Sequence, residues 1–177
     1  MPRPMTDVRV RRAIAEDAAG IGYVQVTAWH EAYTGRMPQS ILDGLDVDSS
    51  TARWHRAIAD EGRDVWVAEI GGAVIGFAAR GPAADAPPGG WRLYALYLLA
   101  AHHGSGAGQA LLDAAIGRAA ASLWILEDNP RARAFYERSG FRSDGAVQDD
   151  ASWGEPIREV RLVRPTQTTK ADAAAEA

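Results

Sequence analysis

The chain switches between two hydrophobic periods, and their order predicts the fold. Residues 8–13 alternate like a strand, whereas residues 16–33 place Ile21 and Val24 at the spacing of a helix whose first turn is acidic. A stretch broken by glycine, proline and aspartate follows, which predicts a loop with a short helix. A second helix is predicted over residues 49–59. The first third of the chain therefore reads as strand, helix, helix.

The period then becomes that of strands. Residues 64–81 form two apolar runs around Gly71 and Gly72, a pattern typical of a hairpin. Residues 82–90 are rich in proline and glycine and predict a loop. Residues 91–100 are almost continuously apolar, as expected of a buried central strand.

The rest of the chain completes a mixed architecture. The remaining elements are a helix over 109–121, a strand over 123–126, a helix within 129–141, and strands over 141–147 and 157–163. This order predicts one α+β domain over residues 1–164 with a mixed, mainly antiparallel sheet. Residues 165–177 lack bulky apolar side chains and predict a disordered tail.

Composition narrows the class of protein. The 177 residues suit one domain, with 47% hydrophobic and 24% charged residues. A formal net charge of −4 argues against a nucleic-acid partner. The absence of cysteine excludes disulfides and thiolate chemistry, and the four histidines show no metal-ligand spacing, so no metal is expected. With neither an apolar leader nor a membrane-length apolar run, the sequence predicts a cytoplasmic protein that does not contact a membrane.

The sequence HHGSGAG, from His102 to Gly108, lies between a predicted strand and a predicted helix. The first N–H groups of a helix lack internal partners, and glycine lets phosphate oxygens approach the backbone closely, so this turn predicts a diphosphate site. Gln109 and Ala110 stand where a nucleotide-hydrolase loop needs Lys-Ser/Thr, and the third glycine of a dinucleotide fingerprint is missing. A flexible turn without a ligand remains the alternative at this point.

A second motif, NPRARAFYERSGF, is a short helix with recognisable ends. Asn129 is a favoured N-cap, Pro130 a favoured first-turn residue, and Gly140 fits the position just past the end of the helix. Ala132 and Tyr136 lie four residues apart and therefore share one face.

Together, LYALYLLAAHHGSGAGQALL and NPRARAFYERSGF resemble the two cofactor motifs of the GCN5-related N-acetyltransferase (GNAT) family, across residues 8 to about 163. The resemblance implies the GNAT fold, with six to seven strands and about four flanking helices. It also implies acetyl-CoA as co-substrate, a primary amine as acceptor, and direct attack in a ternary complex. The pantetheine arm would lie in a V between the strand ending near Leu99 and the strand over 123–126.

The same resemblance assigns roles to individual residues. The diphosphate would rest on the backbone of residues 103–108, Leu98 would bond the pantetheine, and Asn129 would touch the arm. The Tyr136 hydroxyl would act as general acid toward the thioester sulfur. The full set implied to bind the cofactor is Leu96, Leu98, His103, Gly104, Ser105, Gly106, Ala107, Gly108, Asn129, Ala132 and Tyr136. His103 departs from the arginine or glutamine usual in the family, which predicts weaker rather than absent binding.

The resemblance places the acceptor beside the first helix and the loop after it. Trp29, His30 and Tyr33 are the candidate contacts, although Trp29 and Tyr33 can equally be a core stripe. Asp43, Asp46 and Asp48 would, with these aromatic residues, suit a cationic amine, and the alternative is that the three aspartates form a solvated loop. Glu31 is the leading candidate base, with His30 and Glu127 as the other candidates, and each of the three can instead be a solvated surface residue.

The nature of the acceptor stays open at the level of sequence. It could be a small-molecule amine or a peptide amine, and a homodimer is left open. The competing functions are a non-catalytic acyl-CoA-binding protein of the same fold and a protein N-acetyltransferase.

Overall fold

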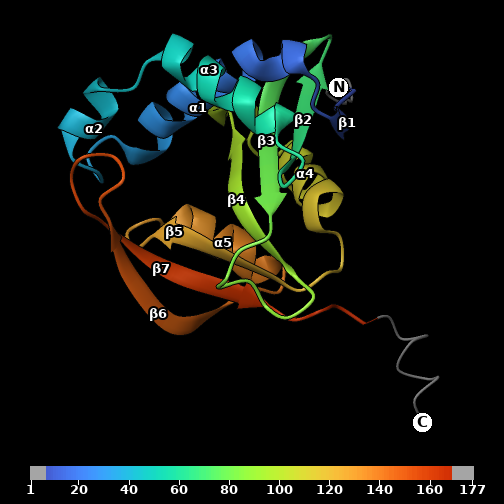
Figure 1. The fold of residues 1–177 in the computed structure, drawn as a ribbon, viewed down its shortest axis with the longest axis vertical. Coiled ribbons are helices and arrows are strands. Elements are labelled where there is room, and N and C mark those ends of the chain that lie inside the picture. The colour runs from blue at the N-terminus through green and yellow to red at the C-terminus, as the bar shows by residue number, and fades with distance from the viewer. Residues whose placement is uncertain (1–6, 169–177) are drawn as a thin grey trace, which may run out of the picture.

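A computed structural model describes residues 7–168 (Figure 1), which form a seven-stranded sheet in the order β1-β2-β3-β4-β5-β7-β6. The strands are β1 Arg9–Arg12, β2 Asp64–Ile70, β3 Ala73–Gly81, β4 Trp91–Leu98, β5 Ala121–Leu126, β6 Arg142–Asp150 and β7 Ile157–Arg164. The helices are α1 Ala18–Tyr33, α2 Gln39–Asp43, α3 Val47–Ala59, α4 Ala107–Ile116 and α5 Pro130–Arg138, with 3-10 turns η1 Ala15–Asp17 and η2 Ala100–His102. Only β4 and β5 pair in parallel, which confirms the mixed, mainly antiparallel α+β prediction.

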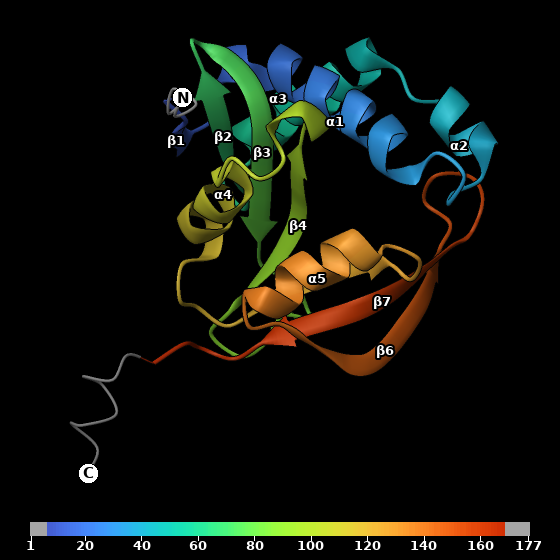
Figure 2. The same cartoon turned by 180° about the vertical axis from the view of Figure 1, so that it is seen from behind.

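Helices cover both faces of the sheet because strand residues alternate between them. Val67 and Phe77 are fully buried in a cluster with α1 and α3, whereas Ala68 and Ile75 belong to a cluster that contains α4 and Tyr136 of α5. Figure 2 shows α4 and α5 on the same side of the molecule, with α1 and α3 beyond the sheet. Each face of the sheet therefore has its own hydrophobic core.

The sheet divides between β4 and β5. Their parallel pairing is confined to Trp91 with Ala121 and Arg92 with Ser122, and β5 instead pairs with β7 along its whole length. Beyond Arg92 the two strands separate. Most of β4 is consequently only partly buried, although its apolar run predicts full burial, because its free edge borders a cavity.

Four predicted helix ends differ from the observed ones, and two of these are the starts of α3 at Val47 and of α4 at Ala107, each two residues earlier than expected. Helix α1 begins at Ala18 rather than residue 16. Asp17 lies in η1, and its carboxylate binds Arg11 instead of accepting an N–H from the first turn of α1. Helix α4 ends at Ile116, well before residue 121, since Gly117 turns the chain with a φ of +49°. Residues 117–120 then lead directly into β5.

The chain still makes hydrogen bonds to the rest of the domain after β7 ends at Arg164. Gln167 donates its backbone N–H to the carbonyl of Arg118 at 2.8 Å and its side-chain amide to the carbonyl of Ser139 at 3.3 Å. Residues 169–177 of the predicted tail lie outside the described residues. Within residues 7–168, no helix is both long and apolar enough to cross a bilayer.

Arg11 joins the first strand to the rest of the fold. Its guanidinium donates to both carboxylate oxygens of Asp17, at 2.7 and 2.9 Å, and to Glu69 at 2.8 Å. The hydrogen bonds from Arg11 hold the pKa of the buried Asp17 carboxyl below its usual value. Asp17 thus stabilises the fold above the usual carboxyl pKa, and that contribution is lost as the pH falls through its lowered pKa.

Replacing Arg11 by methionine should lower the free energy of unfolding at pH 7 by about 2 kcal/mol. This value is smaller than for a fully buried pair, because the Arg11 side chain is 27% exposed. Chemical denaturation measures the change, and the difference from wild type should shrink at acid pH as Asp17 protonates. Arg9→Met is the matched control, since Arg9 is 72% exposed and lies 3.8 Å from Glu69. Equal losses in the two variants would contradict the proposed role of Arg11.

Candidate active site

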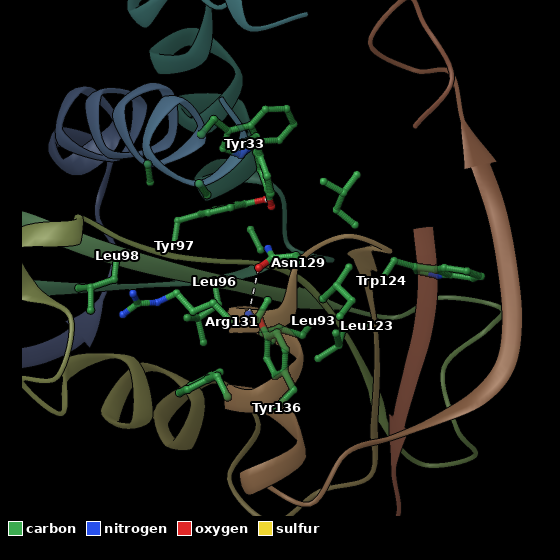
Figure 3. Close-up of a pocket in the computed structure, with 18 of the residues that line it drawn as sticks. Tyr33, Leu93, Leu96, Tyr97, Leu98, Leu123, Trp124, Asn129, Arg131 and Tyr136 are labelled. Carbon is green, nitrogen blue, oxygen red and sulfur yellow. Dashed lines mark hydrogen bonds between the residues drawn. The ribbon is translucent and has the colours of Figure 1, made fainter. Parts of the chain in front are cut away.

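The gap between β4 and β5 opens into a cavity of about 1460 Å³. This volume exceeds the roughly 300–1,000 Å³ of ordinary small-molecule pockets, so there is room for two substrates. One side of the cavity is lined by the glycine loop, α4 and α5, and the other by α1, β6 and β7. Figure 3 shows Leu96 and Leu98 on β4 at one side, with Trp124 on β5 at the other.

The glycine loop presents free N–H groups to one end of the cavity. Within residues 7–168, the backbone N–H groups of Gly104, Gly106 and Gly108 have no hydrogen-bond partner. Gly106 caps α4 in the left-handed region with a φ of +88°, a conformation that favours glycine. Unpaired N–H groups at a helix N-terminus attract anions, so the loop has the backbone geometry that the predicted diphosphate site requires, and the site itself stays a prediction.

The end of β4 offers backbone groups to the same cavity. The Leu99 N–H bonds to Ile75 of β3. Because successive residues of a strand direct their N–H and C=O groups to opposite sides, those of Leu98 point away from β3 and toward the gap. The His103 ring lies 3.0 Å, Nε2 to O, from the Leu98 carbonyl. His103 therefore folds back onto Leu98, the residue that the resemblance assigns to pantetheine binding.

Helix α5 holds Asn129 and Tyr136 against the cavity. The Asn129 side-chain oxygen accepts the Ala132 N–H at 3.0 Å, which confirms the predicted N-cap, and the Asn129 side chain also interacts with the Tyr33 hydroxyl. Gly140 has a φ of +90° just past the helix end, as predicted. In Figure 3, Tyr136 points from α5 toward Asn129, with Tyr33 and Tyr97 beyond it.

The Tyr136 side chain is 7% exposed, and its ring packs between Phe135 and Phe141 with centroid distances of 5.1 and 5.6 Å. No residue in the described part of the chain hydrogen-bonds to its hydroxyl. Burial, with a smaller effect of Tyr33, raises the pKa of the Tyr136 hydroxyl well above its usual value near 10. The phenol is therefore protonated at neutral pH, the form that can donate a proton.

Aromatic side chains line the opposite side of the cavity. Trp29 packs edge-on against Tyr33 at 5.4 Å and lies 4.7 Å from Trp153, between ring centroids. The Tyr33 and Tyr97 hydroxyls are 3.4 Å apart. Burial raises the pKa of both phenols. The two interpretations of Trp29 and Tyr33 are thus compatible, because they are core residues and cavity walls at once.

The structure brings together most of the residues that the sequence singled out. The cavity lining includes Leu96, Leu98, His103, Gly104, Gly106, Gly108, Asn129, Ala132, Tyr136, Trp29, Glu31 and Tyr33. Ser105, Ala107 and His30 are not part of the lining. The Ser105 hydroxyl instead accepts the N–H of the fully buried Ala107 at 3.3 Å.

The acidic candidates have structural partners. Glu31 accepts the N–H of Ala100 at 2.8 Å and so ties α1 to the end of β4. Glu127 lies 3.8 Å from Arg158 and outside the cavity lining. Asp46 caps α3 through the Ser49 N–H at 2.8 Å, as a loop aspartate often does.

Sequence reasoning missed several residues of the acceptor-facing wall. Tyr97 comes from β4, Gln148 from β6, Trp153 from the β6–β7 loop, and Glu159 from β7. A glutamate within the alternating strand IREVRLV was the one available signal, since the alternation places Glu159 on the same face as Ile157.

Comparisons with known proteins agree with this geometry. The chain is 29% identical over 148 residues to a protein of Mycobacterium tuberculosis named a probable N-acetyltransferase, covering 79% of this chain and 83% of that one. The PaiA N-acetyltransferase of Thermoplasma acidophilum, solved with coenzyme A, superposes with a TM-score of 0.68 at 17% identity, covering 90% and 99% of the two chains. YncA of Salmonella typhimurium, a structure with acetyl-CoA, gives 0.62 at 21% identity and covers 93% and 97%. The family model for GNAT acetyltransferases matches residues 21–141, so the chain belongs to the GNAT family of acetyltransferases.

Proposed function

We propose that this protein transfers an acetyl group from acetyl-CoA to a primary amine by direct attack within a ternary complex. The observation that carries the proposal is the set of three glycine N–H groups without a partner within residues 7–168 at one end of the cavity, with the buried Tyr136 farther along it. The N–H groups of Gly104, Gly106 and Gly108 would hold the diphosphate. The backbone of Leu98 and the side chain of Asn129 would hold the pantetheine arm.

Tyr136 would supply the proton that leaves with coenzyme A. Attack by a neutral amine on the thioester forms a C–N bond and breaks the C–S bond, which releases a thiolate. A thiol pKa of roughly 8.5 against a tyrosine pKa of about 10 makes the transfer uphill by about 2 kcal/mol. Burial raises the pKa of Tyr136 further, so its help is modest and the positioning of two bound substrates is the larger effect.

Calorimetric titration with acetyl-CoA, beside NAD and ATP, tests the cofactor. Saturable binding of acetyl-CoA alone is expected. Release of the coenzyme A thiol in the presence of amines then tests catalysis. Binding without turnover of any amine would identify a non-catalytic acyl-CoA-binding protein, and no binding would contradict the proposal.

A further inference from the structure

The acceptor-facing wall of the cavity contains a carboxylate that no sequence motif predicts. Glu159 lies on β7 opposite Leu126 of β5, on the sheet face away from α5. It lines the same cavity as Tyr136, from the other side of the gap between β4 and β5. An acceptor entering opposite the cofactor would therefore meet Glu159.

The Glu159 carboxylate has no basic side chain within ion-pair distance among residues 7–168. It accepts a hydrogen bond from the Gln148 amide at 2.6 Å, but within residues 7–168 it forms no ion pair. The charged groups that act on it are Asp150, which repels it, and Arg92, which attracts it but lies 3.6 Å from Asp85. Its remaining oxygen is available to a cationic ligand.

Aromatic rings complete this end of the cavity. Trp29 lies 6.1 Å from Tyr97 and 4.7 Å from Trp153 between centroids, and Glu159 is close enough to Tyr33 for its charge to raise the pKa of the phenol. Trp29 is 6% exposed, and its indole N–H acts on the nearby Tyr97 hydroxyl but makes no hydrogen bond of normal geometry within the described residues. Aromatic faces beside a carboxylate without an ion-pair partner favour an organic cation.

We infer that the acceptor is a cationic primary amine whose ammonium group binds between Glu159 and the rings of Trp29, Tyr33 and Tyr97, and that Glu159 removes its proton. This inference rests on the proposed acetyl transfer. It assigns the role of base to β7 rather than to Glu31, whose carboxylate already bonds to the Ala100 N–H.

The proton balance of the step is complete. The ammonium gives one proton to the Glu159 carboxylate, and the neutral amine attacks the acetyl carbon. As the C–S bond breaks, the thiolate takes a proton from Tyr136. The second amine proton passes to solvent, and solvent returns one proton to the Tyr136 phenolate. Glu159 returns its proton to solvent, so the products are an acetamide, coenzyme A thiol and one proton. Burial raises the pKa of the Glu159 carboxyl, which makes it a stronger base than an exposed glutamate.

Glu159→Gln tests the inference because it keeps the shape of the side chain and an oxygen that can accept from Gln148. The assay is thiol release from acetyl-CoA with butylamine, 1,4-diaminobutane and 2-phenylethylamine between pH 6 and 10. Wild type should acetylate at least one of these amines, and the variant should lose about 10²-fold in kcat/KM at pH 7. Without a base the variant depends on free neutral amine. Its rate should therefore rise about tenfold per pH unit toward the amine pKa near 10.4, while wild type changes less.

Asp149→Asn is the matched control. Asp149 lies on the same hairpin and loses the same charge, but it is exposed and lies 3.4 Å from Arg158. Its activity and pH profile should match those of wild type. If Glu159→Gln has the wild-type profile, Glu159 is not the base. If wild type binds acetyl-CoA but acetylates none of the three amines, the acceptor class is wrong while the cofactor assignment stands. Failure of acetyl-CoA to bind would instead contradict the proposed function itself.

Discussion

Gly106→Glu should raise the Kd for acetyl-CoA by at least about 100-fold. The side chain would place a carboxylate beside the free N–H groups where the diphosphate is proposed to bind. Repulsion between unit charges about 5 Å apart costs roughly 3 kcal/mol at an effective dielectric of about 20, and each 1.4 kcal/mol changes affinity about tenfold. Calorimetric titration with acetyl-CoA measures the effect.

Gly71→Glu is the matched control for that variant. Gly71 lies in the β2–β3 turn with a φ of +57°, and a side chain there, as at Gly106, would meet nothing within 4 Å. Both variants therefore carry a similar backbone strain of about 1–2 kcal/mol and the same added charge. The control should bind acetyl-CoA within about twofold of wild type. If the two variants bound equally well, the glycine loop would not be the diphosphate site.

Tyr136→Phe should lower kcat by about 10²-fold while the Kd for acetyl-CoA stays within about twofold of wild type. The substitution removes only the hydroxyl, which has no partner in the described part of the chain, and keeps the ring packed between Phe135 and Phe141. Initial rates of thiol release give kcat, and calorimetry gives the affinity. Because its pKa is raised, ionisation of Tyr136 should not reduce the wild-type rate below pH 10.

Tyr23→Phe provides the control, since Tyr23 is 54% exposed on α1. It should retain wild-type kcat. Full activity of Tyr136→Phe would leave Tyr136 with a packing role alone, and the leaving thiolate would then take its proton from water.

The parts of the site that sequence predicts are those set by local rules. The N-cap of α5 at Asn129 and the helix end before Gly140 depend on neighbouring residues, and both are where the sequence expects them. The glycine loop is likewise local, since its free N–H groups follow from the start of α4. For these elements, spacing and residue type are sufficient.

The acceptor-facing wall could not be predicted in this way, because distant pairings assemble it. Glu159 reaches the cavity only because β7 pairs with β5, and Gln148 faces it only after an irregularity in the β6–β7 register between Ser143 and Val147. For Glu31, the sequence predicts the position of the residue but not its hydrogen-bond partner. Its position near the site is as expected, but its partner is an N–H 69 residues away that no local pattern indicates.

The separation of β4 from β5 leaves a free strand edge in the middle of a sheet rather than at its border. Interior strands are normally paired on both sides, and an unpaired edge is open to any extended chain with amide groups. The pantetheine arm is such a chain, so in the proposed complex it acts as a short additional strand. Ligand occupancy and folding are then thermodynamically linked. Each tenfold rise of acetyl-CoA above its Kd would stabilise the native state by about 1.4 kcal/mol. In the proposed complex, the separation of β4 from β5 that makes room for the substrates would thus also make the stability of the domain depend on acetyl-CoA.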